Sequence, residues 1–226
     1  MNQQRPPSPI LPTRHPLVYL ITDRLAFHHP PDHQSTAIDV QLRAIDAAVN
    51  AGCQLIQIRE RGLDRVQLSA FVSAVIEVAR PRGGMVFVNH DIDVAIGSGA
   101  DGVHLRVASL RPREARQLAI EKGRSDLLIG VSTHTIKEAT EAASDSDFIV
   151  CGPIYETKSK REFGPPIGLR TFEEVVRGVR VPVLGIGGID LENFREVLAC
   201  GAAGVAGIGL FSSPETAAAN VRTILG

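Results

Sequence analysis

The sequence has few cysteines, no long apolar run and almost no net charge, and each shortage excludes a class of protein. Its three cysteines, Cys53, Cys151 and Cys200, are an odd number at wide spacing, which argues against a disulfide framework and favours a reducing compartment. No stretch approaches the roughly 18 consecutive apolar residues of a membrane span. No apolar run follows Arg5, so we expect no secretory signal and a cytoplasmic protein.

The formal net charge of the 226-residue chain is −1 at pH 7, so no strong field favours nucleic acid or an anionic membrane surface. An anionic ligand must then be bound by a few local groups. Hydrophobic residues make up 44% and charged residues 22% of the chain, which is ordinary for a globular protein. Because residues 1–16 contain five prolines, we predict a flexible extension there and a single domain over residues 17–226.

Eight short apolar runs alternate with stretches of helical period. The predicted strands span residues 17–21, 55–58, 85–88, 102–105, 127–131, 148–151, 183–186 and 205–208. The predicted helices span residues 36–50, 64–80, 91–96, 112–121, 136–143, 171–178, 191–199 and 214–225. Nearly continuous apolar strands are expected when helices cover one sheet face and a packed barrel fills the other. The sequence therefore predicts an α/β fold, a single (β/α)8 TIM barrel, and the competing architecture is a doubly wound open sheet.

Glycines follow the last two predicted strands, where (β/α)8 barrels usually bind phosphate. Gly187 and Gly188 follow the seventh strand, and Gly209 follows Ile208, the last residue of the eighth. Paired glycines let the backbone approach a ligand closely, and free N–H groups bind phosphate oxygens. The alternative is that the glycines only fit tight turns. We predict a phosphate site built from these four residues.

Two arginines lie at the end of the second predicted strand. Alternation along an extended segment puts Gln57, Arg59 and Arg61 on one side, near the mouth of the barrel. Arginine binds phosphate or carboxylate through paired hydrogen bonds. The alternative is a salt-bridge network with Glu60 and other acids. We predict that these three residues bind substrate.

Polar segments also follow the fifth and sixth strands. Ser132 and His134 follow the fifth, and a histidine there suits proton transfer near neutral pH; the alternative is a helix-capping turn with a bystander histidine. Thr157, Ser159 and Lys160 follow the sixth, in a glycine- and proline-rich loop that is long enough to act as a lid. Their hydroxyl and ammonium groups suit an anion, and a solvated loop is the alternative.

Nine short motifs, from residue 19 towards the C-terminus, resemble the thiamin phosphate synthase/TenI superfamily. They are YLITD (19–23), QIRER (57–61), VN (88–89), ADGVHL (100–105), GVSTH (130–134), GPI (152–154), TKSK (157–160), GIGGI (185–189) and GAAGVA (201–206). Their order and spacing together are specific, whereas no single motif is. The resemblance implies a (β/α)8 fold, a small phosphorylated thiazole as ligand, and Asn89 as a substrate-binding residue.

The superfamily has two main activities. Its synthase couples a pyrimidine pyrophosphate to a thiazole phosphate and releases pyrophosphate with Mg²⁺ assistance, whereas a TenI-type tautomerase aromatises a thiazole carboxylate phosphate by moving a proton. The two Mg²⁺-ligating acids of the synthase pattern are His90 and Ser109 here, and its glycine–glutamine pair is Arg-Val at 106–107. The synthase's lysine after the second strand is Arg61, and its serine after the eighth is Gly209.

Because Mg²⁺ prefers hard oxygen ligands such as carboxylates, these departures favour the tautomerase. We expect His134 to be the catalytic residue that removes and returns the proton, with no metal and no organic cofactor. Arg59 would orient the substrate carboxylate, and Lys160 would add charge to the phosphate site. One alternative is an active synthase, in which Asp91 and Asp23 rebuild a magnesium site. Another is a silent regulatory protein that binds thiazole phosphate; homo-oligomerisation stays open in each case.

Overall fold

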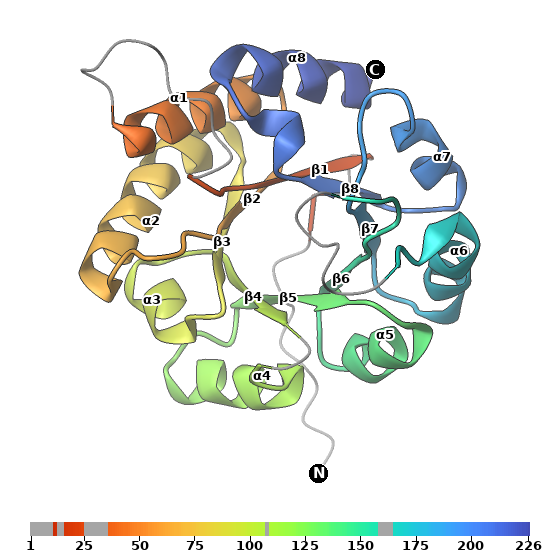
Figure 1. Cartoon of the computed structure of the whole chain (residues 1–226). Helices are drawn as coiled ribbons and strands as arrows, with labels where there is room; N and C mark the ends of the chain where they lie inside the picture. Colours follow the sequence, from red (N-terminus) through yellow and green to blue (C-terminus); the bar gives the residue numbers. More distant parts are fainter. Residues whose placement is uncertain (1–10, 13–15, 25–35, 107–108, 158–164) are drawn as a thin grey trace.

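The computed structural model describes residues 11–12, 16–24, 36–106, 109–157 and 165–226, which form a closed barrel of parallel strands (Figure 1). The strands pair in chain order, and β8 pairs with β1 to close the sheet. They are β1 (Leu17–Ile21), β2 (Leu55–Ile58), β3 (Met85–Asn89), β4 (Gly102–Arg106), β5 (Leu128–Thr133), β6 (Phe148–Cys151), β7 (Val183–Ile186) and β8 (Gly204–Gly207). The predicted (β/α)8 fold is confirmed, and the open-sheet alternative is wrong.

A helix follows each strand, and the helices form a ring outside the sheet (Figure 1). They are α1 (Ala37–Asn50), α2 (Arg65–Ala79), α3 (Ile92–Gly97), α4 (Pro112–Glu121), α5 (Ile136–Ala143), α6 (Gly168–Gly178), α7 (Phe194–Ala199) and α8 (Pro214–Leu225), with the 3₁₀ helices η1 (Arg80–Arg82) and η3 (Gly209–Phe211). The first and last helices, α1 and α8, pack against each other where the ring closes. No helix in the described part of the chain is long and apolar enough to cross a membrane.

Alternate residues of each strand face the barrel interior and the surrounding helices, as a period of two requires. Tyr19, Phe87 and Phe148 fill the interior edge to face, with ring centroids 5.2 to 5.7 Å apart. Their neighbours Val18 and Leu20 instead pack under the helices. Both clusters are closed to solvent, so the barrel is a packed core and leaves only its ends to bind a ligand.

Several strands run further than predicted, and this places candidate site residues on the barrel itself. β3 ends at Asn89, β4 at Arg106 and β5 at Thr133, because ladder pairing continues past the last apolar residue of each strand. Helix α7 starts three residues later than predicted. The Asp190 carboxylate accepts the backbone N–H groups of residues 192 and 193 in a turn, so α7 begins only at Phe194.

Candidate active site

The carboxyl ends of the eight strands meet at one end of the barrel, which we call the mouth. Gln57 and Arg59 lie on the same side of their segment as Leu55, which packs in the barrel interior. Arg106 likewise lies on the side of β4 that carries His104. Polar and basic side chains therefore lie at the mouth, above the aromatic core.

Gln57 and Asn89 are joined at the mouth by a hydrogen bond between their side chains. Gln57 Nε2 donates to Asn89 Oδ1 at 3.1 Å, and only 2% of Gln57 is exposed. The bond fixes the orientation of both amides. These two predicted substrate-binding residues are therefore brought together by the pairing of β2 with β3.

Arg59 is held by an ion pair. Its Nη1 lies 3.0 Å from Asp23 Oδ2, and the two side chains are 25% and 24% exposed. The neighbouring Glu60 does not share in this pair, since its carboxylate accepts from Gln41 Nε2 at 2.7 Å. The predicted salt-bridge alternative thus applies to Arg59 with Asp23 rather than with Glu60, and it orients Arg59 without burying it.

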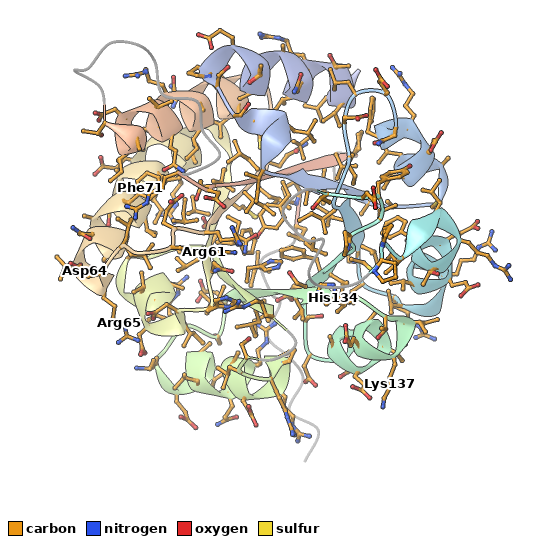
Figure 2. All side chains as sticks on the ribbon, in the orientation of Figure 1. Arg61, Asp64, Arg65, Phe71, His134 and Lys137 are labelled. Atoms are coloured by element: carbon orange, nitrogen blue, oxygen red, sulfur yellow. The ribbon has the colours of Figure 1, made fainter. Side chains whose placement is uncertain are left out.

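Figure 2 shows Arg61 and His134 inside the ring of helices, whereas Arg65 and Lys137 lie towards its outside. Arg61 is exposed and makes no ion pair with another described residue. His134 is oriented by its surroundings, because its Nδ1 is hydrogen-bonded to the Gly152 carbonyl. The structure thus places both predicted residues where a ligand at the mouth can reach them.

A buried histidine that the sequence analysis did not select joins the core to the mouth. His104 is 1% exposed; its Nδ1 lies 3.2 Å from the Tyr19 hydroxyl, and its Nε2 lies 2.8 Å from the Ser132 hydroxyl. Burial, together with the nearby His90, lowers the pKa of His104 to about 3. The neutral ring therefore orients the Ser132 hydroxyl. The signal for this residue was its place two positions before Arg106, on the inward side of the strand.

His90 follows β3 in an unusual backbone conformation. Its φ of 65° lies in the left-handed region that non-glycine residues rarely adopt, and its N–H donates to the His104 carbonyl at 3.0 Å. Burial, and then the positive charges of Arg106 and Arg59, lower the pKa of His90 to about 4. Its Nδ1 is buried without a hydrogen-bond partner among the described residues. Near neutral pH, His90 is thus an uncharged polar group beside two arginines.

The glycine loops follow β7, which is opposite β3 in the closed ring of eight strands, and β8, which is opposite β4. Gly187 and Gly188 have positive φ, and a Cβ on Gly188 would lie 2.6 Å from the Cβ of Tyr155. Close packing therefore requires the glycine pair even without a ligand. Their N–H groups donate to no described residue. A Cβ on Gly209 would meet nothing within 4 Å, so this loop is open, and the phosphate site stays a prediction.

The loop after β6 is described only in part. Thr157 is half-buried and interacts within the structure. Ser159 and Lys160 lie outside the described residues, and so does the centre of the predicted lid. The predicted roles of these three residues therefore stay predictions.

The acids near the mouth do not gather into a magnesium site. The Asp91 carboxylate caps the N-terminus of α3 and lies 2.9 Å from Arg65 Nε, and Asp23 is bound to Arg59. In the ranges that the structure describes, no three His, Cys, Asp or Glu side chains are grouped as metal ligands would be. The residues at the two ligand positions of the synthase pattern, His90 and Ser109, carry no carboxylate, so this pair does not fit a carboxylate-bound magnesium ion.

The fold defines a class, the (β/α)8 barrels, whose enzymes have their sites at the carboxyl ends of the strands. Within that class, the family model described as thiamine monophosphate synthase (TMP-TENI) matches residues 18–211. The chain belongs to this family, as the nine motifs indicated.

Relatives are similar over nearly the whole chain. A putative thiamine-phosphate synthase of Geobacter sulfurreducens is 35% identical over 209 residues, which cover 92% of each chain. A thiamine-phosphate synthase of Roseiflexus castenholzii is 35% identical over 210 residues, or 92% of this chain and 86% of the other. Among solved structures, a thiamine phosphate pyrophosphorylase from Pyrococcus furiosus has a TM-score of 0.77 and 26% identity, covering 93% of this chain and 94% of the other.

These comparisons overturn the expectation of a tautomerase. Relatives at 32 to 35% identity carry the synthase name, and nothing in the comparisons supports an isomerase. The expectation rested on five departures from the synthase pattern, and the two at His90 and Ser109 concern the metal ligands rather than the reaction as a whole. Arg61 replaces a lysine of the synthase pattern but keeps its positive charge, so it is no departure in electrostatics.

Proposed function

We propose that the protein is a thiamin phosphate synthase, which couples a pyrimidine pyrophosphate to a thiazole phosphate and releases pyrophosphate. The similarity to proteins of that name over 92% of the chain supports this activity. The observation that carries the proposal is the presence at the mouth of two separate groups of candidate anion-binding residues: arginines after β2, and glycine loops after β7 and β8. A synthase has two phosphorylated substrates and needs two such places.

The proposed reaction exchanges bonds between the two substrates, and no side chain of the protein forms a covalent bond. The thiazole nitrogen attacks the methylene carbon of the pyrimidine, so that a C–N bond forms while the C–O bond to pyrophosphate breaks. No proton moves in this step. The protein must hold the two substrates in line and stabilise the negative charge that develops on the leaving pyrophosphate.

Each predicted residue has a role in this proposal. Arg59 and Arg61 bind the pyrophosphate group through paired hydrogen bonds, with Asp23 holding Arg59 in position. The Gln57–Asn89 pair and Ser132 offer fixed amide and hydroxyl groups to the pyrimidine ring. The thiazole phosphate is bound by the backbone N–H groups of the loops after β7 and β8, the residues being Gly187, Gly188, Ile208 and Gly209. His134 positions the thiazole between the two anion sites.

Mg²⁺ assists pyrophosphate departure in the synthase pattern. The residues at its ligand positions, His90 and Ser109, supply no carboxylate, and Asp91 and Asp23 are engaged elsewhere. Every role assigned above therefore belongs to the chain's own residues.

We place this activity in the cytoplasm. All three cysteines are free thiols, and burial raises the pKa of Cys53 to about 12 and that of Cys151 to about 11. Protonated, buried thiols are unreactive and suit a reducing compartment.

The test is a coupling assay on purified protein, with both substrates, read as thiamin phosphate by chromatography. The Arg61→Gln variant is expected to lower kcat/KM by about 10- to 100-fold, the value of a charge-assisted hydrogen-bond pair. Arg65→Gln is the matched control, because Arg65 is 70% exposed and lies towards the outside of the ring (Figure 2). Absence of thiamin phosphate under all conditions, or equal losses in the two variants, would refute the proposal.

A further inference from the structure

The mouth differs in charge from the synthase pattern at the ends of β3 and β4. His90 and Ser109 stand where that pattern has carboxylates, and Arg106 stands where it has glycine. Two negative charges are absent and one positive charge is added, a change of three charges towards positive. A site that binds a polyanion but lacks the carboxylates that hold a metal ion needs positive charge from its own side chains.

Arg106 lies where it can supply that charge. It is the last residue of β4, pairs in register with Ser132, and shares the inward side of its strand with His104. Ser109 fixes its backbone, since the Ser109 hydroxyl donates to the Arg106 carbonyl at 2.6 Å and accepts from the Arg106 N–H at 3.0 Å. The Arg106 side chain is exposed and makes no ion pair within the described ranges. Ser109, which stands where the synthase pattern has a metal-binding acid, thus fixes the backbone of Arg106.

His90 follows β3, the strand that lies between β2, which precedes Arg59, and β4, which ends at Arg106. Arg59, His90 and Arg106 therefore lie at the ends of three adjacent strands, which pair side by side in the sheet. The buried Nδ1 of His90 has no hydrogen-bond partner in the described part of the chain. A neutral imidazole adds no negative charge that would repel an anion.

We propose that Arg106, together with Arg59 and Arg61, binds the substrate diphosphate directly and stabilises the departing pyrophosphate in the place that a magnesium ion takes in the synthase pattern. This inference rests on the proposed function. As the C–N bond forms, the electrons of the C–O bond pass to the pyrophosphate oxygen, and three guanidinium groups face the charge that collects there. The reaction then proceeds without a divalent cation.

The first experiment measures binding of inorganic pyrophosphate by calorimetry in EDTA. Wild-type protein is expected to bind, and Arg106→Gln to raise the Kd by about 10- to 100-fold. Arg113→Gln, an exposed arginine on α4, is the matched control and should leave the Kd unchanged. No binding in EDTA, or equal affinity of wild type and Arg106→Gln, overturns the inference. Circular dichroism and a thermal unfolding curve establish that each variant is folded.

The second experiment separates this inference from the proposed function. In the coupling assay, wild type should keep its rate in EDTA, whereas a triple variant with His90→Asp, Ser109→Asp and Arg106→Gly should need added Mg²⁺. If wild type itself needs Mg²⁺ and Arg106→Gln has no effect, the inference fails while the synthase stands. If no thiamin phosphate forms with or without Mg²⁺, the synthase fails. The pyrophosphate measurement then tests only whether Arg106 binds the diphosphate. Weaker binding by Arg106→Gln supports that role, and equal binding rejects it.

Discussion

Nε2 of His104 lies 2.8 Å from the Ser132 hydroxyl, which joins a buried ring to a residue at the mouth. The other ring nitrogen faces the Tyr19 hydroxyl in the core. Burial raises the pKa of Tyr19 and lowers that of His104, so both groups are neutral. The pair fixes a hydroxyl at the mouth without placing a charge in the barrel interior.

The first prediction concerns stability against pH. The folded-state pKa of His104 is about 3 and its unfolded value is about 6.5, so the unfolded chain takes up the proton first. The free energy of unfolding should therefore fall as the pH drops below about 6.5, by roughly 1 kcal/mol per pH unit from this residue. His104→Gln keeps polar atoms in place but removes the titration, and should flatten the slope of denaturation midpoints between pH 6.5 and 5. Parallel slopes in the two proteins would mean that folding does not lower the pKa of His104.

The fold could be predicted from the sequence because the spacing of the apolar residues distinguishes strands from helices. Strands such as Leu55–Ile58 are continuous apolar runs apart from one inward polar residue, Gln57, and the helices between them carry clear caps such as Thr36. The ends of the strands were less readable. Arg106 and Thr133 break the apolar pattern, yet the ladder holds them in extended conformation.

The candidate site was readable only in part. Residues after the strands, such as Arg59 and His134, were found because loops at the carboxyl ends carry function in this fold. His104 was missed because it sits inside an apolar run, where its partner Ser132 on another strand cannot be seen. The ion pair of Asp23 with Arg59 joins residues 36 positions apart, and only strand pairing brings them together.

The second prediction concerns His134. Because the proposed coupling transfers no proton, His134→Asn should lower kcat by less than about tenfold and act mainly on the KM for thiazole phosphate. Loss of a general acid–base catalyst instead costs about 10²–10⁴-fold. Steady-state kinetics with each substrate varied in turn will distinguish these results, and a kcat loss in the larger range would contradict a positioning role.

The third prediction concerns packing beneath the site. A Cβ on Gly130 would lie 2.3 Å from Phe148 Cζ and 2.8 Å from His104 Nδ1, in a core with no room to relax. Gly130→Ala should therefore lower the free energy of unfolding by about 1–3 kcal/mol, measured by urea denaturation. The matched control is Gly97→Ala, because a Cβ added to Gly97 would meet nothing within 4 Å. Gly123→Ala is not a suitable control, because Gly123 has a positive φ that strains an alanine. Equal effects of Gly130→Ala and Gly97→Ala would show that the barrel interior is looser than the structure indicates.

The last prediction concerns the open loop after β8. Gly209 stands where the synthase pattern has serine, and an added Cβ there meets nothing within 4 Å. Gly209→Ser should therefore fold normally and offer a hydroxyl to the thiazole phosphate, which lowers its KM by about 2- to 10-fold, the value of one neutral hydrogen bond. Gly209→Ala is the matched control, since it adds the Cβ without the hydroxyl and should leave the KM unchanged. Gly188→Ala marks the contrast: its Cβ would lie 2.6 Å from the Cβ of Tyr155, so it should lose stability. If serine and alanine at position 209 give the same KM, the thiazole phosphate does not bind at this loop.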